Sequence, residues 1–335
     1  MPSNLDDKYS KAITERQKYI DAILNSTSRN KIVVAGPGTG KTYLFKEVLK
    51  GRTNTLTLTF VNALVEDLSL ELYGLSEVRT LHSFARSELG KATNGEVKLF
   101  PKLPQVIGED AKILLGKEID FDHIFHNRDD SNEGIEFYKK RKNYYDKHYG
   151  YSDVIFAIVK HFEGKKDKIP TYEQVVVDEF QDFNKLEVSL IELLSEKSPI
   201  LLAGDDDQAL YAFKSASAEH IRNKHGDTCP DYASFSLPYC SRCARVIVEA
   251  ANDIIYQTIK NKLLNGRINK PYQYFEDEKK DKESDQNPKL VYNQSFAKQI
   301  PWLIQQRIGE IAEEVKGPFS ILIIYKYVFI LLTFF

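Results

Sequence analysis

The residues best suited to chemistry lie in the glycine-rich segment 35–42, which reads Ala-Gly-Pro-Gly-Thr-Gly-Lys-Thr. An apolar run at 32–34 precedes this segment and a helix-like pattern at 43–49 follows it, so the expected order is strand, loop and helix. Glycines let successive backbone N–H groups turn toward phosphate oxygens at the N-terminus of a helix. The segment therefore predicts a binding site for a nucleoside triphosphate. Its expected binding residues are Gly36, Gly38, Thr39, Gly40, Lys41 and Thr42.

Two side chains of this loop have specific expected roles. Lys41 can reach the β- and γ-phosphates, and the hydroxyl of Thr42 can coordinate Mg²⁺. Ala35 stands where the general pattern begins with glycine, but the glycines that follow still give the loop its freedom. The alternative is a glycine-rich turn without a ligand. The strand and helix patterns on either side favour the phosphate loop.

A pair of acidic residues follows a second apolar run, at 175–177. Asp178 and Glu179 would stand at the end of a buried strand, where carboxylates are costly unless they hold a metal ion or polarise water. In a phosphate-loop enzyme, one carboxylate supports the Mg²⁺ shell and the other activates the attacking water. We therefore predict that Asp178 is a metal ligand and that Glu179 is the general base. Without the phosphate loop, the pair would instead suggest a strand end in solvent.

A third polar segment follows the apolar run 200–203 and reads Gly-Asp-Asp-Asp-Gln-Ala-Leu-Tyr-Ala-Phe-Lys from 204 to 214. Gln208 can bond to a γ-phosphate or to water. Tyr211 and Phe213 offer ring faces on which bases could stack. On spacing alone, these two aromatic residues would more often belong to a core.

The wider pattern of the chain predicts an α/β fold. Strand-like runs at 32–34, 55–60, 175–177 and 200–203 alternate with helix-like patterns, which is typical of a parallel, doubly wound sheet. Between 89 and 168 the sequence is helix-like and rich in Lys, Tyr and His, which indicates an inserted subdomain.

Composition places limits on the function and on the compartment. The chain has 335 residues, enough for about two domains, and a formal net charge of −2. A net charge this close to zero does not by itself indicate binding to nucleic acid, so a polyanion would have to bind in a local groove. Three cysteines are too few for a disulfide framework, and the polar N-terminus lacks the apolar core of a signal peptide. These features predict a cytoplasmic protein.

The C-terminal segment 319–335 is almost entirely apolar, and Lys326 interrupts it. We expect residues 321–325 to form a buried parallel strand. Residues 327–335 have no cap and no turn pattern, and they indicate an aberrant hydrophobic tail from a shifted reading frame or a truncated gene. A membrane span is the alternative, but the run is short and carries a central charge.

Two further groups have competing interpretations. Cys240 and Cys243, with Cys229 and His225 upstream, could hold zinc, although structural cysteines at the start of a helix are favoured. Residues 139–145 interleave basic side chains with tyrosines, which suits the phosphates and bases of a single strand. The alternative for this run is a solvated helix face.

Taken in order, these blocks resemble the motifs of superfamily 1A DNA helicases of the UvrD/Rep/PcrA type, over roughly residues 10–255. By this resemblance, Gln17 would read the adenine of ATP and Arg242 would contact the γ-phosphate. Ser241 stands where the family usually has a tyrosine that stacks on adenine, and Tyr239 is close by. The catalytic residues that the resemblance implies are Lys41, Glu179, Gln208 and Arg242.

The same resemblance implies a site for single-stranded DNA. Residues 59–62 and 80–84 match motifs that grip DNA, and residues 204–214 match the motif that couples the ATP and DNA sites. Phe213 stands where the family usually has a base-stacking tryptophan, and Lys214 where it usually has arginine. The implied DNA-contacting residues are Thr59, Phe60, Asn62, Thr80, His82, Tyr211 and Phe213.

The resemblance also implies an architecture. It is a RecA-like P-loop parallel sheet with a helical inserted subdomain and the start of a second RecA-like domain. The expected divisions are 1–88 with 169–252 for the first RecA-like ATP-binding domain, 89–168 for the inserted subdomain, 253–326 for an incomplete second domain and 327–335 for the aberrant tail.

The implied activity is that of an ATP-dependent 3′–5′ DNA helicase, with ATP and Mg²⁺ as cofactors and single-stranded DNA as partner. Nothing after Lys326 resembles the family's remaining motifs, including one that carries an arginine finger. We therefore expect an incomplete motor, unless a partner chain completes the second domain. One alternative is a nucleotide-gated single-stranded DNA-binding module with little ATPase or unwinding activity. Another is a membrane-anchored regulatory ATPase.

Overall fold

The computed structural model describes residues 4–60, 62–209, 215–226, 229–278, 280–282, 296–315, 317–325 and 328–334. The chain divides into two compact units, Met1–Pro288 and Lys289–Phe335. This division lies beyond the expected boundary at 252/253, because the segment 267–275 bonds to Pro37 of the phosphate loop and to Asp206. The domain assignments made from the sequence stay predictions.

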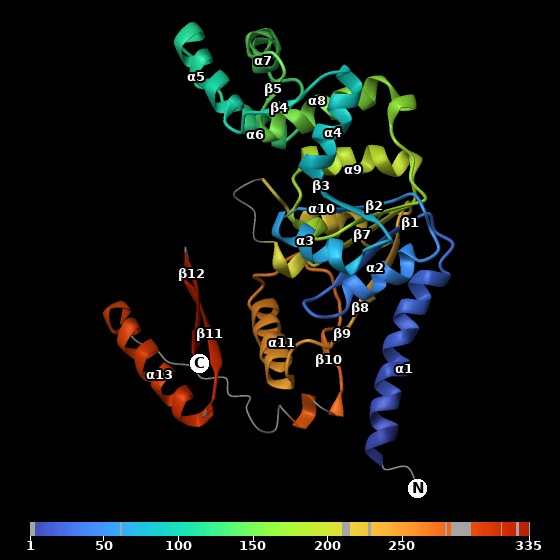
Figure 1. Cartoon of the computed structure of the whole chain (residues 1–335), viewed down its shortest axis with the longest axis vertical. Coiled ribbons are helices and arrows are strands. Elements are labelled where there is room, and N and C mark those ends of the chain that lie inside the picture. The colour runs from blue at the N-terminus through green and yellow to red at the C-terminus, as the bar shows by residue number, and fades with distance from the viewer. Residues whose placement is uncertain are drawn as a thin grey trace. The chain divides into compact units, whose positions relative to one another are not determined.

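A six-stranded sheet, parallel throughout, forms the centre of the first unit (Figure 1). Its order is β3-β2-β6-β7-β1-β8. The strands are β1 (Asn30–Ala35), β2 (Thr55–Thr59), β3 (Glu77–Thr80), β6 (Gln174–Val177), β7 (Ile200–Gly204) and β8 (Ala233–Leu237). Central strands of such a sheet are buried on both faces, which is why they read as continuous apolar runs. The predicted α/β fold with a parallel, RecA-like sheet is confirmed.

Alternate side chains of the strands enter two separate cores. On β1, Ile32 and Val34 join the larger core, while Val33 and Ala35 join the smaller one. This is the two-residue period of a strand that is covered on both faces. Apolar side chains of α1 (Asn4–Asn25), α2 (Lys41–Leu49) and α3 (Asn62–Glu71) fill the smaller core.

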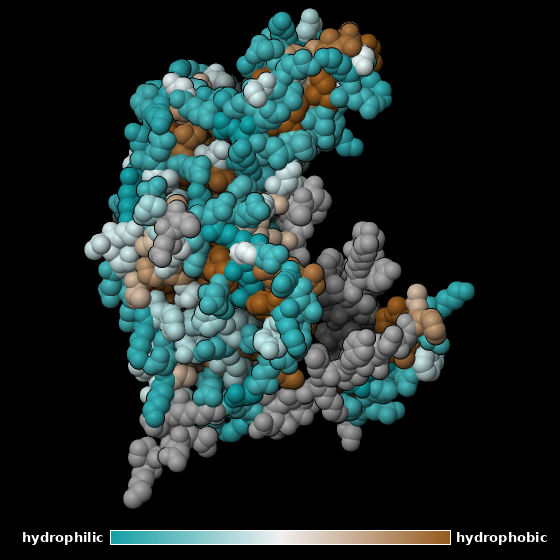
Figure 2. All heavy atoms as spheres, turned by 180° about the vertical axis from the view of Figure 1, so that it is seen from behind, coloured by the Kyte–Doolittle hydropathy of each residue, from teal (hydrophilic) through white to brown (hydrophobic). Residues whose placement is uncertain are grey.

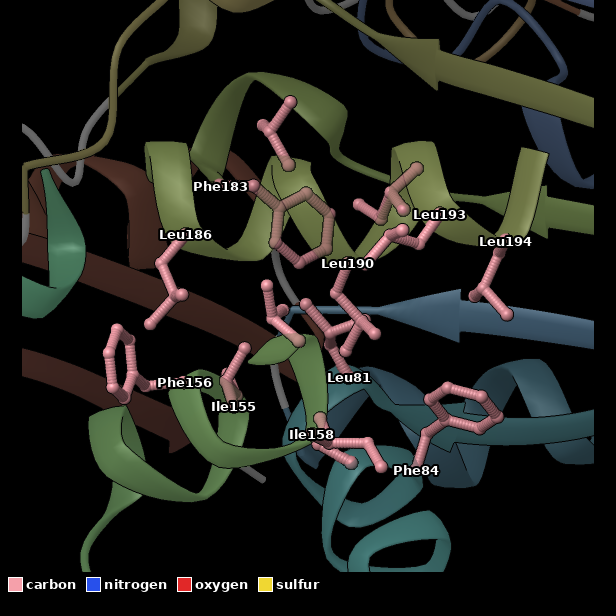
Figure 3. Packing of buried hydrophobic residues seen from close by; sticks show 14 of the residues in the cluster. Leu81, Phe84, Ile155, Phe156, Ile158, Phe183, Leu186, Leu190, Leu193 and Leu194 are labelled. Atoms are coloured by element: carbon pink, nitrogen blue, oxygen red, sulfur yellow. The ribbon is translucent and has the colours of Figure 1, made fainter. Parts of the chain in front are cut away.

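The larger core joins the sheet to a helical part of the chain. Figure 3 shows side chains of α4 (Leu81–Thr93), α8 (Tyr151–Gly164) and α9 (Lys185–Lys197) packed against one another. Leu81 and Phe84 come from α4, Ile155 and Ile158 from α8, and Leu190 from α9, all of them buried. The helical part is therefore anchored on the sheet through one continuous apolar core.

Further elements complete the first unit. In the helical part they are α5 (Leu103–Leu115), α6 (Phe121–His126), α7 (Gly134–Lys142) and the short parallel pair β4 (Lys98–Leu99) and β5 (His148–Tyr149). After α9 come α10 (Glu219–Lys224), β9 (Tyr239–Cys240), α11 (Arg245–Lys260) and β10 (Gln273–Tyr274), and β9 pairs with β10 in parallel. Single 3₁₀ turns lie at Asn143–Tyr145, Lys166–Lys168, Phe180–Asp182 and Asp206–Gln208. Figure 2 shows a largely hydrophilic face, with scattered brown patches. On α5, Ile113, Leu114 and Leu115 are exposed.

The second unit contains the 3₁₀ turn Ala297–Gln299, helix α13 (Ile300–Val315) and strands β11 (Phe319–Tyr325) and β12 (Val328–Phe334). A strand at 321–325 was expected and is present, but the prediction that it is parallel is wrong, because β11 pairs with β12 in antiparallel register. The prediction failed because only two residues join the strands, whereas a parallel connection needs a crossover of about a dozen or more. No helix among the residues described here is long and apolar enough to cross a membrane.

Candidate nucleotide site

The phosphate loop connects β1 to α2 at the carboxyl end of the sheet. Gly38 has a φ of +69° and Gly40 a φ of +96°, and Gly40 is the N-cap of α2. These left-handed conformations favour glycine, and they follow from the turn that the chain makes before the helix. The buried Thr39 donates a hydrogen bond from Oγ1 to the carbonyl of Gly36 at 2.8 Å, which closes the turn. The loop residues that were predicted from the sequence thus form one turn at a helix N-terminus.

The glycines also admit neighbouring side chains. A β-carbon on Gly38 would lie 2.5 Å from the β-carbon of Arg242, and one on Gly36 would lie 2.9 Å from the ring of Tyr272. Real β-carbon contacts are longer than these distances, so larger residues at either position would displace the neighbours. Both glycines therefore let distant parts of the chain close against the loop.

Lys41, the first residue of α2, faces the acidic residues that follow β6. Its Nζ lies 2.9 Å from Oε1 of Glu179. Burial opposes the charged amine, but Asp178, Glu179 and Asp205 outweigh this effect, and the pKa of Lys41 is raised. Lys41 is therefore a cation held in place by carboxylates.

The acidic pair is held in an unusual backbone conformation. Glu179 has a φ of +52°, in the left-handed region that a side chain other than Gly, Asn or Asp rarely adopts. Its backbone N–H donates to Oδ1 of the buried Asp178 at 3.0 Å. Burial raises the pKa of Asp178, with Lys41 opposing and Glu179 adding to this shift. Strain of this kind is concentrated at functional sites, where the surrounding structure imposes it.

A hydrogen-bonded chain links Glu179 to the end of β7. The side-chain amide of Gln181 donates to Oε2 of Glu179 at 2.9 Å, and its oxygen accepts from the backbone N–H of Asp205 at 2.9 Å. Asp205 in turn accepts from the side-chain amide of Gln208 at 2.6 Å. The structure thus joins Glu179 and Gln208 through Gln181 and Asp205, which had no assigned role in the sequence-based prediction.

Arg242 is brought to the loop by the residue before it. The backbone N–H of Ser241 donates to the carbonyl of Gly38 at 2.9 Å, and the Ser241 hydroxyl donates to the same oxygen at 3.2 Å. This contact spans about two hundred residues of sequence, and it places Arg242 beside Gly38 of the loop. Arg242 therefore lies against the phosphate loop, and its contact with the γ-phosphate stays a prediction.

Gln17 lies on α1, whose apolar side chains pack in the same core as those of α2, the helix that follows the phosphate loop. Its side-chain amide donates to Oδ1 of Asp21 at 2.8 Å. The neighbouring Arg16 places a guanidinium nitrogen against Gly40, and its guanidinium carbon lies 5.4 Å from the ring centroid of Phe275. A residue next to Gln17 therefore contacts the loop, and Arg16 is a cation there that the sequence motif did not single out.

Thr59 and Thr80, which were expected to contact DNA, lie side by side where β2 and β3 end. Thr59 is buried, and the Thr80 hydroxyl accepts from the backbone N–H of Ser83 at 3.1 Å, which caps α4. His82 has its Nε2 3.8 Å from Oε1 of Glu187. Thr80 and His82 therefore have structural partners of their own, whereas the buried hydroxyl of Thr59 has no hydrogen-bond partner among the described residues.

The remaining predicted DNA-contacting residues divide into two groups. Phe60 makes an edge-to-face contact with Phe183, with ring centroids 5.6 Å apart. Asn62 begins α3. Tyr211 and Phe213 lie outside the described residues, and so does Lys214.

The oxygen atoms of Thr42 and Asp178 are ligands of the type that Mg²⁺ prefers, and they fit the predicted metal role. Among the described residues, the only group of three His, Cys, Asp or Glu close enough to hold an ion is Asp205, Asp206 and Asp207. Lysine and arginine side chains contact these carboxylates instead. The zinc alternative at the cysteines has no such cluster in the described part of the chain, and all three cysteines are free thiols.

Sequence reasoning missed the segment 267–275, which follows α11. Tyr272 places its ring over Gly36 and donates its hydroxyl to the carbonyl of Pro37 at 3.0 Å. Lys270 and Arg267 of this segment contact the aspartates after β7. No spacing or composition in the sequence marks this segment as part of the site, because its partners are far away along the chain.

Comparisons with known proteins identify the family of the chain. The family described as AAA domain matches residues 20–214, which is more than half of the chain. DNA helicase II of Haemophilus influenzae is 29% identical over 110 residues, 31% of this chain and 15% of that protein. ATP-dependent DNA helicase PcrA of Staphylococcus aureus is 28% identical over 117 residues, 33% of this chain and 16% of that protein. The match thus spans about a sixth of the length of these relatives. The chain belongs to the AAA domain family, in its UvrD/PcrA-like helicase group.

Proposed function

We propose that this chain is an ATP-dependent 3′–5′ DNA helicase or translocase of the UvrD type, which binds ATP with Mg²⁺ and single-stranded DNA. The observation that carries the proposal is the 2.9 Å contact between Lys41 and Glu179 beside the phosphate loop. This contact holds a phosphate-binding cation and a candidate base in one place. A glycine-rich turn without a ligand would not need either of them.

The nucleotide-binding step follows from these contacts. A triphosphate in the loop offers Lys41 oxygens that carry more charge than one carboxylate, so Lys41 would exchange Glu179 for phosphate. Glu179 is then free to accept a proton from the attacking water. Mg²⁺, held by Thr42 and Asp178, would neutralise charge that develops on the phosphates. Arg242 would contact the γ-phosphate, and Gln208 would sense it.

The DNA-binding part of the proposal places the single strand near the ends of β2 and β3, where Thr59, Phe60, Asn62, Thr80 and His82 follow the sheet. Tyr211 and Phe213 would stack on bases. We further propose that a partner chain completes a second RecA-like domain and supplies an arginine to the far side of ATP, because such an arginine speeds phosphoryl transfer strongly. The free thiols of all three cysteines suit a cytoplasmic location.

A second candidate function is a nucleotide-gated single-stranded DNA-binding module with little turnover. The observation that favours it is the cover over the loop, where the ring of Tyr272 lies against Gly36. In such a module, ATP would displace the cover and change the affinity for DNA, with hydrolysis playing no part.

The deciding experiment is steady-state ATP hydrolysis by the purified chain with and without single-stranded DNA, beside Lys41→Ala. Turnover that DNA stimulates and Lys41→Ala abolishes supports the helicase proposal. ATP binding without turnover, with DNA affinity that depends on ATP, supports the gated module. An absence of ATP binding contradicts both functions.

A further inference from the structure

Lys270 is surrounded by carboxylates at the end of β7. Its Nζ lies 2.5 Å from Oδ1 of Asp205 and 3.1 Å from Oδ2 of Asp207, and it also contacts Oδ1 of Asp206. The side chain of Lys270 is 5% exposed, and those of Asp205 and Asp206 are 3% and 0% exposed. Side chains this deeply buried do not carry charge without partners.

Two arginines complete the charge balance of this cluster. Arg222 from α10 reaches Asp206 at 3.0 Å, and Arg267 reaches Asp207 at 2.8 Å. Burial opposes the charge of Lys270, but the aspartates outweigh it, so the pKa of Lys270 is raised. Burial likewise opposes ionisation of Asp206, yet hydrogen bonds from Lys270 and from the N–H of Ile268 lower its pKa. Three cations thus face three carboxylates, and Lys270 is the cation that touches all three.

Asp205 connects this cluster to the nucleotide site. One of its carboxylate oxygens faces Lys270, and the other accepts from the side-chain amide of Gln208 at 2.6 Å. Its backbone N–H donates to Gln181, whose amide donates to Glu179. The oxygen of Gln181 is packed so closely on Gly204 that a β-carbon there would lie 2.5 Å from it. A displacement of Asp205 would therefore be transmitted to Gln208 and, through Gln181, to Glu179.

We propose that Lys270 is a positioning residue of the nucleotide site, which fixes Asp205 and thereby the side chains of Gln208 and Glu179. The inference rests on the proposed function, because these two side chains are the ones that would meet the γ-phosphate and the attacking water. Among the described residues, Lys270 itself bonds to the aspartates and not to Gln208 or Glu179. Its role is to hold the aspartate from which the hydrogen-bonded chain begins.

The test compares Lys270→Met with Lys270→Arg in the full chain. A third variant, Lys270→Met with Asp206→Asn, removes the bond to Asp205 while lowering the number of buried carboxylates, so that the fold is kept. Lys166→Met is the matched control, because Lys166 pairs only with the exposed Glu196 at 2.8 Å among the described residues. Each variant is first checked for cooperative thermal unfolding.

For ATP hydrolysis, both variants that contain Lys270→Met are expected to lose about tenfold or more in kcat, with KM changed less than about threefold, because misplaced groups slow the chemical step more than they weaken binding. Lys270→Arg should recover part of the loss, and Lys166→Met should behave as the wild type. Unchanged kcat in folded Lys270 variants overturns the proposal. A rise in KM without a fall in kcat overturns it too.

A measurement that does not depend on ATP hydrolysis tests this inference separately from the proposed function. Amide hydrogen exchange of residues 204–208 reports on the bond from Asp205 to Gln181. Exchange should become at least about tenfold faster in the Lys270→Met variants and return toward the wild-type rate in Lys270→Arg. If the wild type neither hydrolyses nor binds ATP, the proposed function fails, and this exchange alone decides the role of Lys270. Unchanged exchange rejects the role.

Discussion

The Nζ atom of Lys41 lies 2.9 Å from Oε1 of Glu179, so the two side chains with the central expected roles neutralise each other. They come from different elements, the start of α2 and the turn after β6. Both are largely buried, with 15% and 21% of their side chains exposed. A bound triphosphate would compete with Glu179 for Lys41. Binding of nucleotide and release of the base are therefore expected to be one coupled event.

Replacing Glu179 with Gln tests this coupling. We expect kcat for ATP to fall by about 10²- to 10⁴-fold, because the variant lacks the group that accepts the proton of water. Nucleotide affinity should be kept or should rise, since Lys41 loses its competing carboxylate. Steady-state hydrolysis measures the first effect, and titration with a fluorescent ATP analogue measures the second.

The control for Glu179→Gln is Glu196→Gln, which removes a carboxylate that pairs with the exposed Lys166. It should leave both quantities at their wild-type values. Weaker nucleotide binding in Glu179→Gln would show that the carboxylate helps to hold ATP instead of competing with it.

Gly38→Ala should weaken the site through geometry alone. The new β-carbon would lie 2.5 Å from that of Arg242, at a φ of +69°. We expect a loss of about 1–2 kcal/mol in the free energy of unfolding, typical of a side chain forced into the left-handed region, and a clear loss of nucleotide affinity. Chemical denaturation and nucleotide titration measure the two effects.

Gly164→Ala provides the comparison for Gly38→Ala. Gly164 ends α8, and a β-carbon there meets no atom within 4 Å. This variant should be as stable as the wild type or slightly more stable. Equal behaviour of the two alanine variants would mean that Arg242 is not held against the loop.

Much of the fold could be predicted from the sequence, because its signals are local. The apolar runs at 32–34, 175–177 and 200–203 become β1, β6 and β7, and the glycines after β1 form the expected turn. Burial on both faces produces this pattern wherever a parallel sheet is covered by helices. The pairing of residues 321–325 could not be derived this way, since an apolar run does not specify the direction of its partner strand.

Only part of the candidate site could be predicted from the sequence, because some of its contacts join distant parts of the chain. Lys41 and Glu179 stand in recognisable patterns, so their types and spacing predicted roles, which stay predictions. Lys270 and Tyr272 lie in a short polar stretch after α11 and acquire partners only through folding. The partners of Lys270 are the aspartates after β7, about sixty residues earlier. Contacts of this range leave no periodicity in a single sequence.

Stability should depend on pH through Asp153, a buried residue of α8 whose carboxylate accepts a hydrogen bond from Tyr138 at 2.6 Å. Burial raises the pKa of Asp153 from 3.8 to about 6, although Tyr138 and Lys142 oppose the shift. Between these two values the unfolded chain has lost the proton that the folded chain keeps. The unfolded state then binds fewer protons, so stability falls as the pH rises through this window.

Asp153→Asn removes this titration and keeps the shape of the side chain. Relative to this variant, the wild type should lose up to about 3 kcal/mol of unfolding free energy between pH 4 and pH 7. Urea denaturation at a series of pH values measures the difference. The exposed Asp167→Asn serves as control and should show no such trend. A constant difference between wild type and Asp153→Asn would mean that Asp153 stays ionised in the fold.

The last prediction concerns nucleotide affinity and the ring of Tyr272. This ring covers Gly36, and its hydroxyl donates to the carbonyl of Pro37. If the ring must move before a triphosphate can enter, the apparent affinity is lowered by the fraction of molecules in which the loop is open. Tyr272→Ala should then bind a fluorescent ATP analogue about three- to tenfold more tightly than the wild type. Tyr272→Phe keeps the ring and loses the hydroxyl that bonds to Pro37, so it should show a smaller gain. Weaker binding by Tyr272→Ala, with Tyr272→Phe unchanged, would instead make the ring a part of the binding surface that ATP uses.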